Sequence, residues 1–260
     1  MAIDLTSRRD IPSRFECKYL LPRAYVHELR MMLRPFVEPD RFARRWPQYR
    51  YPISSLYLDS PDYFLYSQTD NGEKNRFKLR IRSYDDEPGT PVFFEVKKRM
   101  NGIVSKWRSA VRRDMAARYL SGGILSGGPR DPAPDLGEFQ RDVAKVGAGP
   151  VCRVRYQREA YEAKGGEPTR ITFDSDLTYN LTHDGNLATN GPGWESVPMD
   201  TVILEVKFTE RFPTWIQDIV DTFDLQRTSV PKYGLCIGRA LARQQTSIPM
   251  VRHRSLLTRA

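Results

Sequence analysis

Two neighbouring stretches decide the fold: NRFKLRIRSY at residues 75–84 and PVFFEVKKR at residues 91–99. Basic and apolar side chains alternate through the first stretch, where Lys78, Arg80 and Arg82 are set against Phe77, Leu79 and Ile81. A period of two residues is typical of a β-strand with one polar and one apolar face. The second stretch alternates in the same way, so both are predicted to be strands with a charged face.

Turn signals connect these two strands to each other and to a third. The polar segment DDEPGT lies between them, and the dipeptide Asn-Gly at 101–102 precedes IVSKWRSAV at 103–111. Asn-Gly between two alternating stretches favours a tight hairpin. The segment 75–111 is therefore predicted to be an antiparallel meander.

The rest of the chain continues in the same style. Further strands are predicted at 13–21, 51–60, 151–163, 169–179 and 201–210, and helical spacing predicts helices at 22–36, 136–146 and 213–225. About eight strands with a few helices indicate an α+β fold. We expect a mostly antiparallel sheet that closes into a β-barrel, with the helices packed outside it.

The chain is predicted to hold one main domain at 13–241, after an N-terminal extension at 1–12 and before a basic C-terminal tail at 242–260. The Gly- and Pro-rich segment 121–137 is expected to be a loop within the domain, because the strand pattern resumes after it. No apolar run is long enough to cross a membrane, and the N-terminus has no secretory signal. These observations predict a cytoplasmic protein.

Composition narrows the classes of function. The 260 residues include 41 Lys and Arg against 32 Asp and Glu, a formal net charge of +9. This charge suggests an anionic partner, which composition leaves open among nucleic acid, a membrane surface and a phosphate-rich small molecule. The three scattered cysteines and three unpaired histidines fit no disulfide framework, zinc site or His-based triad. The segment SGGILSGGP at 121–129 lacks the Lys-Ser/Thr of a phosphate-binding P-loop.

The charged strand faces carry the functional argument. Cations in mid-strand positions are mixed with fewer carboxylates: Lys78, Arg80, Arg82, Lys97, Lys106, Arg170 and Lys207 with Glu16, Glu95, Asp174, Asp176 and Glu205. If these faces point inward, the cations repel one another unless a polyanion neutralises them. A phosphate chain would supply that charge, since Arg binds phosphate in a bidentate manner, and the carboxylates would hold a divalent metal.

Two other interpretations of the same residues stay open at this point. Alternating charges on strands are most often a solvated outer face. Basic residues mixed with aromatic ones, as in ARRWPQYRY at 43–51, are also typical of a nucleic-acid-binding surface.

Eight short motifs occur in an order that resembles the vacuolar transporter chaperone (VTC) domain of the CYTH-like triphosphate tunnel superfamily. They are FECKYLLP, SLYLDSPDY, FKLRIRSY, FFEVKKR with NGIVSKWR, YQREAY, RITFDSDL, ILEVKF and SVPKYGLC. The resemblance runs from about residue 13 to residue 241 and fits a bacterial-type single-domain member. It implies a tunnel of antiparallel strands and a polyphosphate polymerase, or, as in relatives, a triphosphate hydrolase or cyclase.

The resemblance also implies site residues. The phosphate-binding and catalytic set is Lys18, Arg80, Arg82, Lys97, Lys106, Arg158, Arg170 and Lys232, of which Arg80, Arg82, Lys97 and Arg170 would clamp the nucleotide phosphates. Glu205 matches the metal-binding glutamate, and Glu95 is expected to assist it in binding Mn²⁺ or Mg²⁺. Plain structural roles are the alternatives: a rim position for Lys18, a cation–π contact with Trp107 for Lys106, and an exposed surface for Lys232.

Arg158 fits the pattern least well. Strict alternation places it on the same face as Cys152, Val154 and Tyr156, so we expect a β-bulge to turn it inward. Two further positions depart from the family. Leu235 stands where polymerases have a second lysine, and Glu16 is followed by Cys17 and Lys18 instead of the hydrolase signature Glu-x-Glu-x-Lys.

These features predict polymerase-like transfer of the terminal phosphate of ATP onto polyphosphate. A non-catalytic polyphosphate-binding module, suggested by Leu235, and an inorganic triphosphatase are the alternatives. The expected partners are ATP and polyphosphate or triphosphate, with no nucleic acid. A membrane link would require another polypeptide, and the oligomeric state is left open.

Overall fold

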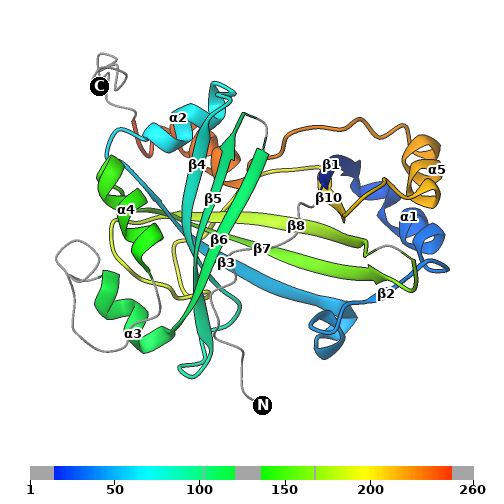
Figure 1. Cartoon of the computed structure of the whole chain (residues 1–260), viewed down its shortest axis with the longest axis horizontal. Helices are drawn as coiled ribbons and strands as arrows, with labels where there is room; N and C mark the ends of the chain where they lie inside the picture. The colour runs from blue at the N-terminus through cyan, green and yellow to red at the C-terminus, as the bar shows by residue number, and fades with distance from the viewer. Residues whose placement is uncertain (1–14, 102, 121–135, 167, 248–260) are drawn as a thin grey trace.

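A computed structural model describes residues 15–101, 103–120, 136–166 and 168–247 (Figure 1). The strands are β1 (Phe15–Pro22), β2 (Val37–Pro39), β3 (Arg50–Asp59), β4 (Arg76–Ser83), β5 (Pro91–Met100), β6 (Ile103–Arg112), β7 (Gly149–Ala163), β8 (Arg170–Leu181), β9 (Glu195–Ser196) and β10 (Thr201–Phe208). The α-helices are α1 (Val26–Leu33), α2 (Phe64–Asp70), α3 (Arg113–Arg118), α4 (Gly137–Val146), α5 (Thr214–Thr222) and α6 (Lys232–Ala242). Short 3₁₀ turns occupy Arg23–Tyr25, Ala43–Arg45 and Pro47–Tyr49.

All ten strands belong to one antiparallel sheet in the order β1-β10-β8-β7-β3-β4-β5-β6, with β2 and β9 paired to β7 and β8. The predicted α+β class and antiparallel sheet are confirmed, but the predicted closed barrel is corrected. Within the described residues, β1 and β6 end the hydrogen-bonded path without pairing to each other, so the sheet is open. The sheet is nevertheless strongly curled. The contact between Glu16 on β1 and Lys97 on β5, with an N···O distance of 3.6 Å, shows that its two ends approach each other.

The helices α1, α4 and α5 cover the apolar face of the sheet, on the outside as predicted. α1 and α5 pack on the outward side chains of β1, β8 and β10 through residues such as Leu29 and Ile219. At the other end of the molecule, α4 packs Phe139 and Val143 against β4, β5 and β6 (Figure 1). This packing fixes the direction of every strand's alternation, so the charged side chains face the opposite way.

α6 lies on the charged side of the sheet. Its Tyr233 stacks on Tyr57 of β3 with ring centroids 4.7 Å apart, and Cys236 and Ile237 pack among residues of β7. The buried carboxylate of Asp59 fixes this arrangement, because it accepts hydrogen bonds from the Leu65 and Tyr66 amides of α2 and from the Tyr233 hydroxyl. One side chain therefore joins β3, α2 and α6.

Some elements differ from the sequence prediction. The helix predicted at 22–36 ends at Leu33, because Pro35 has no amide hydrogen with which to continue the helical hydrogen bonds. The structure adds β2, α2, α3, β9 and α6, which were not predicted. The extension at 1–12, the loop at 121–135 and the tail beyond residue 247 lie outside the described residues. Within the described ranges, no helix is long and apolar enough to cross a membrane.

Candidate functional site

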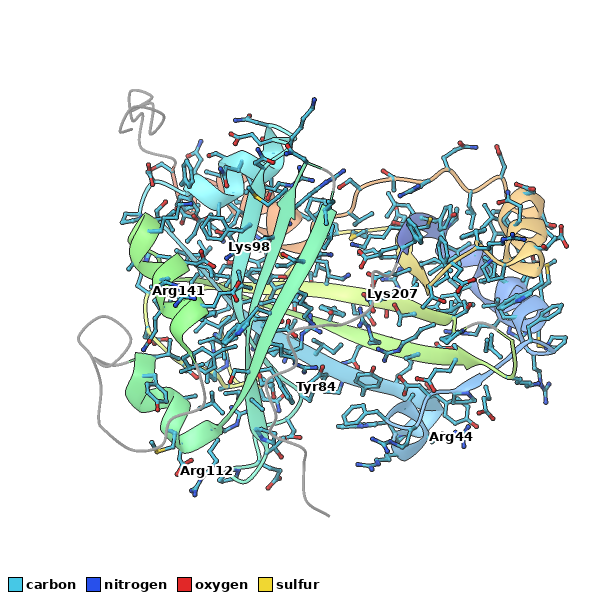
Figure 2. All side chains as sticks on the ribbon, in the orientation of Figure 1. Arg44, Tyr84, Lys98, Arg112, Arg141 and Lys207 are labelled. Atoms are coloured by element: carbon cyan, nitrogen blue, oxygen red, sulfur yellow. The ribbon has the colours of Figure 1, made fainter. Side chains whose placement is uncertain are left out.

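One face of the curled sheet gathers the charged side chains, and we call the space over this face the lumen. Strand register brings them together. Lys78, Lys97 and Lys106 occupy one row across β4, β5 and β6, and Tyr57, Arg80, Glu95 and Arg108 occupy the next row. Lys18 lies beside Glu205, and Lys207 lies between Glu16 and Arg170. Lys207 is labelled in Figure 2, where β10 runs beside β8.

Neighbouring residues on β5 show how strictly alternation separates the two faces. Lys97 points into the lumen, whereas Lys98, also labelled in Figure 2, points to the helical side. The amine of Lys98 pairs there with Glu138 and Asp142 of α4, at 3.0 and 2.8 Å. The charged faces are thus not a solvated exterior, and the inward interpretation holds for the strands that carry the predicted site.

Glu95 is a buried carboxylate of the lumen and is surrounded by cations. Its oxygens lie 2.6 Å from Arg80, 2.8 Å from Lys106, 3.3 Å from Arg108 and 3.9 Å from Arg82. Burial alone would raise the pKa of Glu95, but these cations, led by Arg80 and Arg82, hold it well below its usual range. Glu95 is therefore ionised and sets the positions of four basic side chains.

Glu16 and Glu205 form a second group with three lysines. Lys18 lies 2.5 Å from Glu16 and 3.7 Å from Glu205, and Lys207 contacts both carboxylates. Burial and the charge of Glu205 raise the pKa of Glu16, but Lys18, Lys207 and Lys97 outweigh them and lower it to about 2. Burial likewise raises the pKa of Glu205, while Lys207 and Lys18 hold it well below its usual range.

Arg158 reaches the lumen without the expected bulge, and that expectation is corrected. Its guanidinium makes a bidentate pair with Asp174 at 2.6 and 2.7 Å and lies 5.4 Å from the ring centroid of Tyr156. Register with β3 runs unbroken past Tyr156 and Arg158, so both share the lumen face. The irregularity near Arg155 falls on β8, where Asp176 adopts a positive φ of 56°. The apolar residues on this face of β7 are covered by α6, which the sequence alone did not indicate.

Lys232 lies at the start of α6 and not at a closing strand. Its Nζ lies 2.7 Å from Asp174 and 4.7 Å from the ring centroid of Tyr156, so it is not an exposed surface lysine. Leu235, one turn further along the helix, packs against the apolar cluster beneath α6. Of positions 232 and 235, only Lys232 therefore contributes a positive charge to the lumen.

Arg170 lies beside Lys207 in the sheet and donates to Asp40 at 2.5 Å and to the Tyr51 hydroxyl at 3.3 Å. Asp40 was missed by the sequence prediction, because it follows a short edge strand with no motif around it. Arg108 was missed too, although its alternation with Lys106 was sufficient to find it. The structure brings every predicted cation and both predicted glutamates to the lumen face, with Lys18, Lys97, Lys106 and Lys207 only partly buried.

The carboxylates differ in their suitability for a divalent metal. Among the described residues, no cluster of three or more His, Cys, Asp or Glu side chains could enclose one. Mg²⁺ is often bound by one or two carboxylates together with substrate phosphates, and Glu205 with Glu16 fits that donor set. Glu95 has four basic side chains in contact with it, whereas Glu205, within the described ranges, forms ion pairs only with Lys18 and Lys207 and lies in one group with Glu16. That Glu95 assists Glu205 in binding a metal stays a prediction from the sequence.

The lumen as a whole has an excess of positive charge. Its cations are Lys18, Lys78, Arg80, Arg82, Lys97, Lys106, Arg108, Arg158, Arg170, Lys207 and Lys232, and its carboxylates are Glu16, Asp40, Glu95, Asp174 and Glu205. No nucleophile with an activating base is needed to use such a site. It can bind and polarise a polyanion, and these features define a triphosphate-tunnel type of phosphate-handling protein.

The family comparison agrees with this class. The VTC domain profile matches residues 13–241, and the chain belongs to the VTC domain family. No curated protein matches the sequence. Among solved structures, the fold is similar to a protein assigned as an adenylate cyclase from Bacillus halodurans, with a TM-score of 0.51, 12% identity, and coverage of 85% of this chain and 94% of that chain. The PH1819 protein from Pyrococcus horikoshii OT3 aligns with a TM-score of 0.42 and 13% identity, over 89% of this chain and 99% of that chain.

Proposed function

We propose that this protein transfers the terminal phosphoryl group of ATP to a polyphosphate chain held in the lumen. The supporting observation is the convergence of cations from separate strands on one curled sheet face, in excess over the carboxylates. A linear polyphosphate carries negative charge on every phosphate along its length, so it matches cations that are spread over several strands. Family membership supports phosphate chemistry, and the polymerase reaction is the specific proposal.

In this reaction the terminal oxygen of the acceptor chain attacks the γ-phosphorus of ATP. The bond between the γ-phosphorus and the β,γ-bridging oxygen breaks, a new P–O–P linkage forms, and ADP leaves with the electron pair. Arg80, Arg82, Lys97, Lys106 and Arg170 would clamp the phosphates and stabilise the charge that develops on the transferred group. Lys18, Arg158 and Lys232 would position the remainder of the chain.

Glu205 and Glu16 are the residues that would hold a divalent ion, either Mn²⁺ or Mg²⁺. When bound, that ion would neutralise phosphate oxygens and act as a Lewis acid at the transferred group. Lys18 and Lys207 already lie against both carboxylates, so they would keep the two glutamates ionised and oriented toward the lumen.

The test is to incubate the purified protein with ATP and Mn²⁺ and to resolve the products by gel electrophoresis and phosphate release. Long chains with ADP support the polymerase. Free phosphate from tripolyphosphate indicates the triphosphatase instead, and tight binding of polyphosphate without turnover indicates a binding module. Leu235 favours that last alternative, since an apolar side chain replaces a cation there.

Glu205→Gln should abolish metal-dependent turnover while the melting temperature and circular dichroism remain those of a folded protein. The matched control is Glu195→Gln, which removes a carboxylate that pairs with Arg243. The control should retain activity. Full turnover by Glu205→Gln would exclude its role.

A further inference from the structure

A cavity of about 240 Å³ lies on the helical side of the sheet, between α1 and the outer faces of β7, β8 and β10. A single water molecule needs about 10–15 Å³, so the cavity has room for a small organic molecule. Strand alternation keeps it apart from the lumen. Glu159 and Ser175 line the cavity, whereas their chain neighbours Arg158 and Asp174 pair with each other on the lumen face.

Basic side chains form much of the cavity wall. Four of them line it: Arg23, His27, Arg30 and Arg50. The guanidinium of Arg30 makes a bidentate pair with Glu159 at 2.8 and 2.6 Å, and the hydroxyl of Tyr161 donates to the same carboxylate. Both oxygens of Glu159 are therefore engaged, and the wall offers a ligand mainly hydrogen-bond donors.

Asp176 fixes the other two arginines. Its carboxylate lies 3.1 Å from Arg23 and 2.8 Å from Arg50, and it also accepts a hydrogen bond from Ser175. Asp176 adopts a positive φ of 56° beside the irregularity of β8, so a local departure from the strand pattern accompanies this contact. Two guanidinium groups are thus held at the cavity wall before a ligand arrives.

The three arginines keep charge and donors in reserve. Within the described part of the chain, Arg23 and Arg30 donate through Nε and Nη2, and Arg50 donates through Nη2 alone. The Nη1 group of each has no protein acceptor there. Three guanidinium groups against two carboxylates leave an excess of positive charge, and guanidinium groups bind phosphate oxygens through paired N–H donors.

The floor of the cavity is apolar. Val26, Phe173 and Val202 line it and belong to the core cluster beneath α1. Apolar walls with a few convergent polar groups are typical of small-molecule sites. The arginines and the floor together fit a ligand that has an anionic group and an apolar remainder.

We propose that this cavity binds a small phosphorylated molecule, with its phosphate group on the three arginines and its remainder against the apolar floor. The site is separate from the lumen, and the proposal does not depend on phosphoryl transfer there.

Arginine modification by phenylglyoxal, read by peptide mass spectrometry, tests the site residue by residue. The three side chains are 36–48% exposed, so all should react in the free protein. Phenyl phosphate should slow modification of Arg23, Arg30 and Arg50. Arg112, which pairs with Asp114 on the surface, should react at an unchanged rate. Inorganic phosphate should protect the same three arginines only at higher concentration, because it makes no contact with the floor.

Arg50→Gln provides a second measurement. It removes one charge-assisted contact, so half-protection of Arg23 and Arg30 should require about tenfold more phenyl phosphate. Arg112→Gln is the matched control and should leave their protection unchanged. Circular dichroism and the melting temperature check that both variants are folded.

Equal modification of the three arginines with and without phenyl phosphate would overturn the proposal, and so would protection that Arg50→Gln leaves intact. Equal protection by inorganic phosphate would contradict the part given to the floor. Protection of Arg80 in the lumen by polyphosphate is read from the same peptides digest and reports on the proposed function, so either site can fail without the other.

Discussion

At the scale of single residues, Glu95 shows how the fold prepares a cationic site before a ligand arrives. One carboxylate that is 1% exposed lies against Arg80, Arg82, Lys106 and Arg108. Ionised Glu95 offsets part of their mutual repulsion and leaves the remainder for a bound polyanion. The same carboxylate therefore stabilises the free protein and limits how tightly an anion binds.

Replacing Glu95 with Gln should affect these two properties in opposite directions. Removing one partner from a buried ion-pair group destabilises a protein by about 3–5 kcal/mol, so the ligand-free variant should melt at a lower temperature. Polyphosphate should then raise its melting temperature by more than it raises that of the wild type. Thermal denaturation with and without polyphosphate measures both effects.

Glu138→Gln provides the control for this variant. Glu138 pairs with Lys98 on the outer side of β5 and is 32% exposed, so its loss should cost less than about 1 kcal/mol. It should also leave the ligand-induced shift unchanged. An equal shift in Glu95→Gln and the wild type would contradict the role given to Glu95.

At the scale of elements, Asp59 connects the fold to the site. It is the last residue of β3, and its carboxylate accepts hydrogen bonds from two amides of α2 and from the Tyr233 hydroxyl of α6. Because Lys232 directly precedes Tyr233, the position of this lysine against Asp174 depends on the same carboxylate.

Asp59→Ala should lower the free energy of unfolding by about 3 kcal/mol, because several buried donors lose their acceptor. Urea denaturation measures the change. Asp62→Ala, which removes an acceptor for the nearby Ser60 hydroxyl, should cost about 1 kcal/mol or less. Equal losses in the two variants would show that Asp59 does not join the three elements.

Most strands could be predicted because β4, β5 and β6 alternate strictly and pack their apolar side chains on helices. The helix α6 could not be predicted as a cover for the charged face, since its apolar pattern does not show which sheet face it meets. The same uncertainty led to the expected bulge at Arg158. Alternation within each strand was sufficient to predict that the cations share one face of the sheet. Which carboxylate pairs with each cation, including Asp40 with Arg170, depends on strand register, which no local pattern encodes.

At the scale of the whole molecule, the lumen is a coupled set of titrating groups. Burial and neighbouring cations lower the pKa of Lys78 to about 7, and burial lowers that of Lys106 to about 8. Burial raises the pKa of Tyr84, but Arg82 and Arg108 outweigh it and lower this pKa to about 8. As the pH rises through this range, the lysines lose positive charge and Tyr84 gains negative charge.

Polyphosphate binding should therefore weaken with rising pH, with full strength below about pH 6.5 and about a tenfold loss by pH 9. Titrations at constant ionic strength measure this dependence. The double variant Lys78→Arg, Lys106→Arg keeps both charges throughout the range and should give a flatter profile. Affinity that rises toward pH 9 in the wild-type protein would contradict the inward placement of these groups.

The open edge of the sheet has a consequence for how a long polymer gets in and out. Among the described residues, the ion pair of Glu16 with Lys97 links β1 to β5, and no backbone hydrogen bonds join β1 to β6. High salt or a competing anion would weaken such ion pairs without breaking the backbone hydrogen bonds of any strand. On the proposed function, a long phosphate chain would then enter from the side of the sheet and need not be threaded from one end.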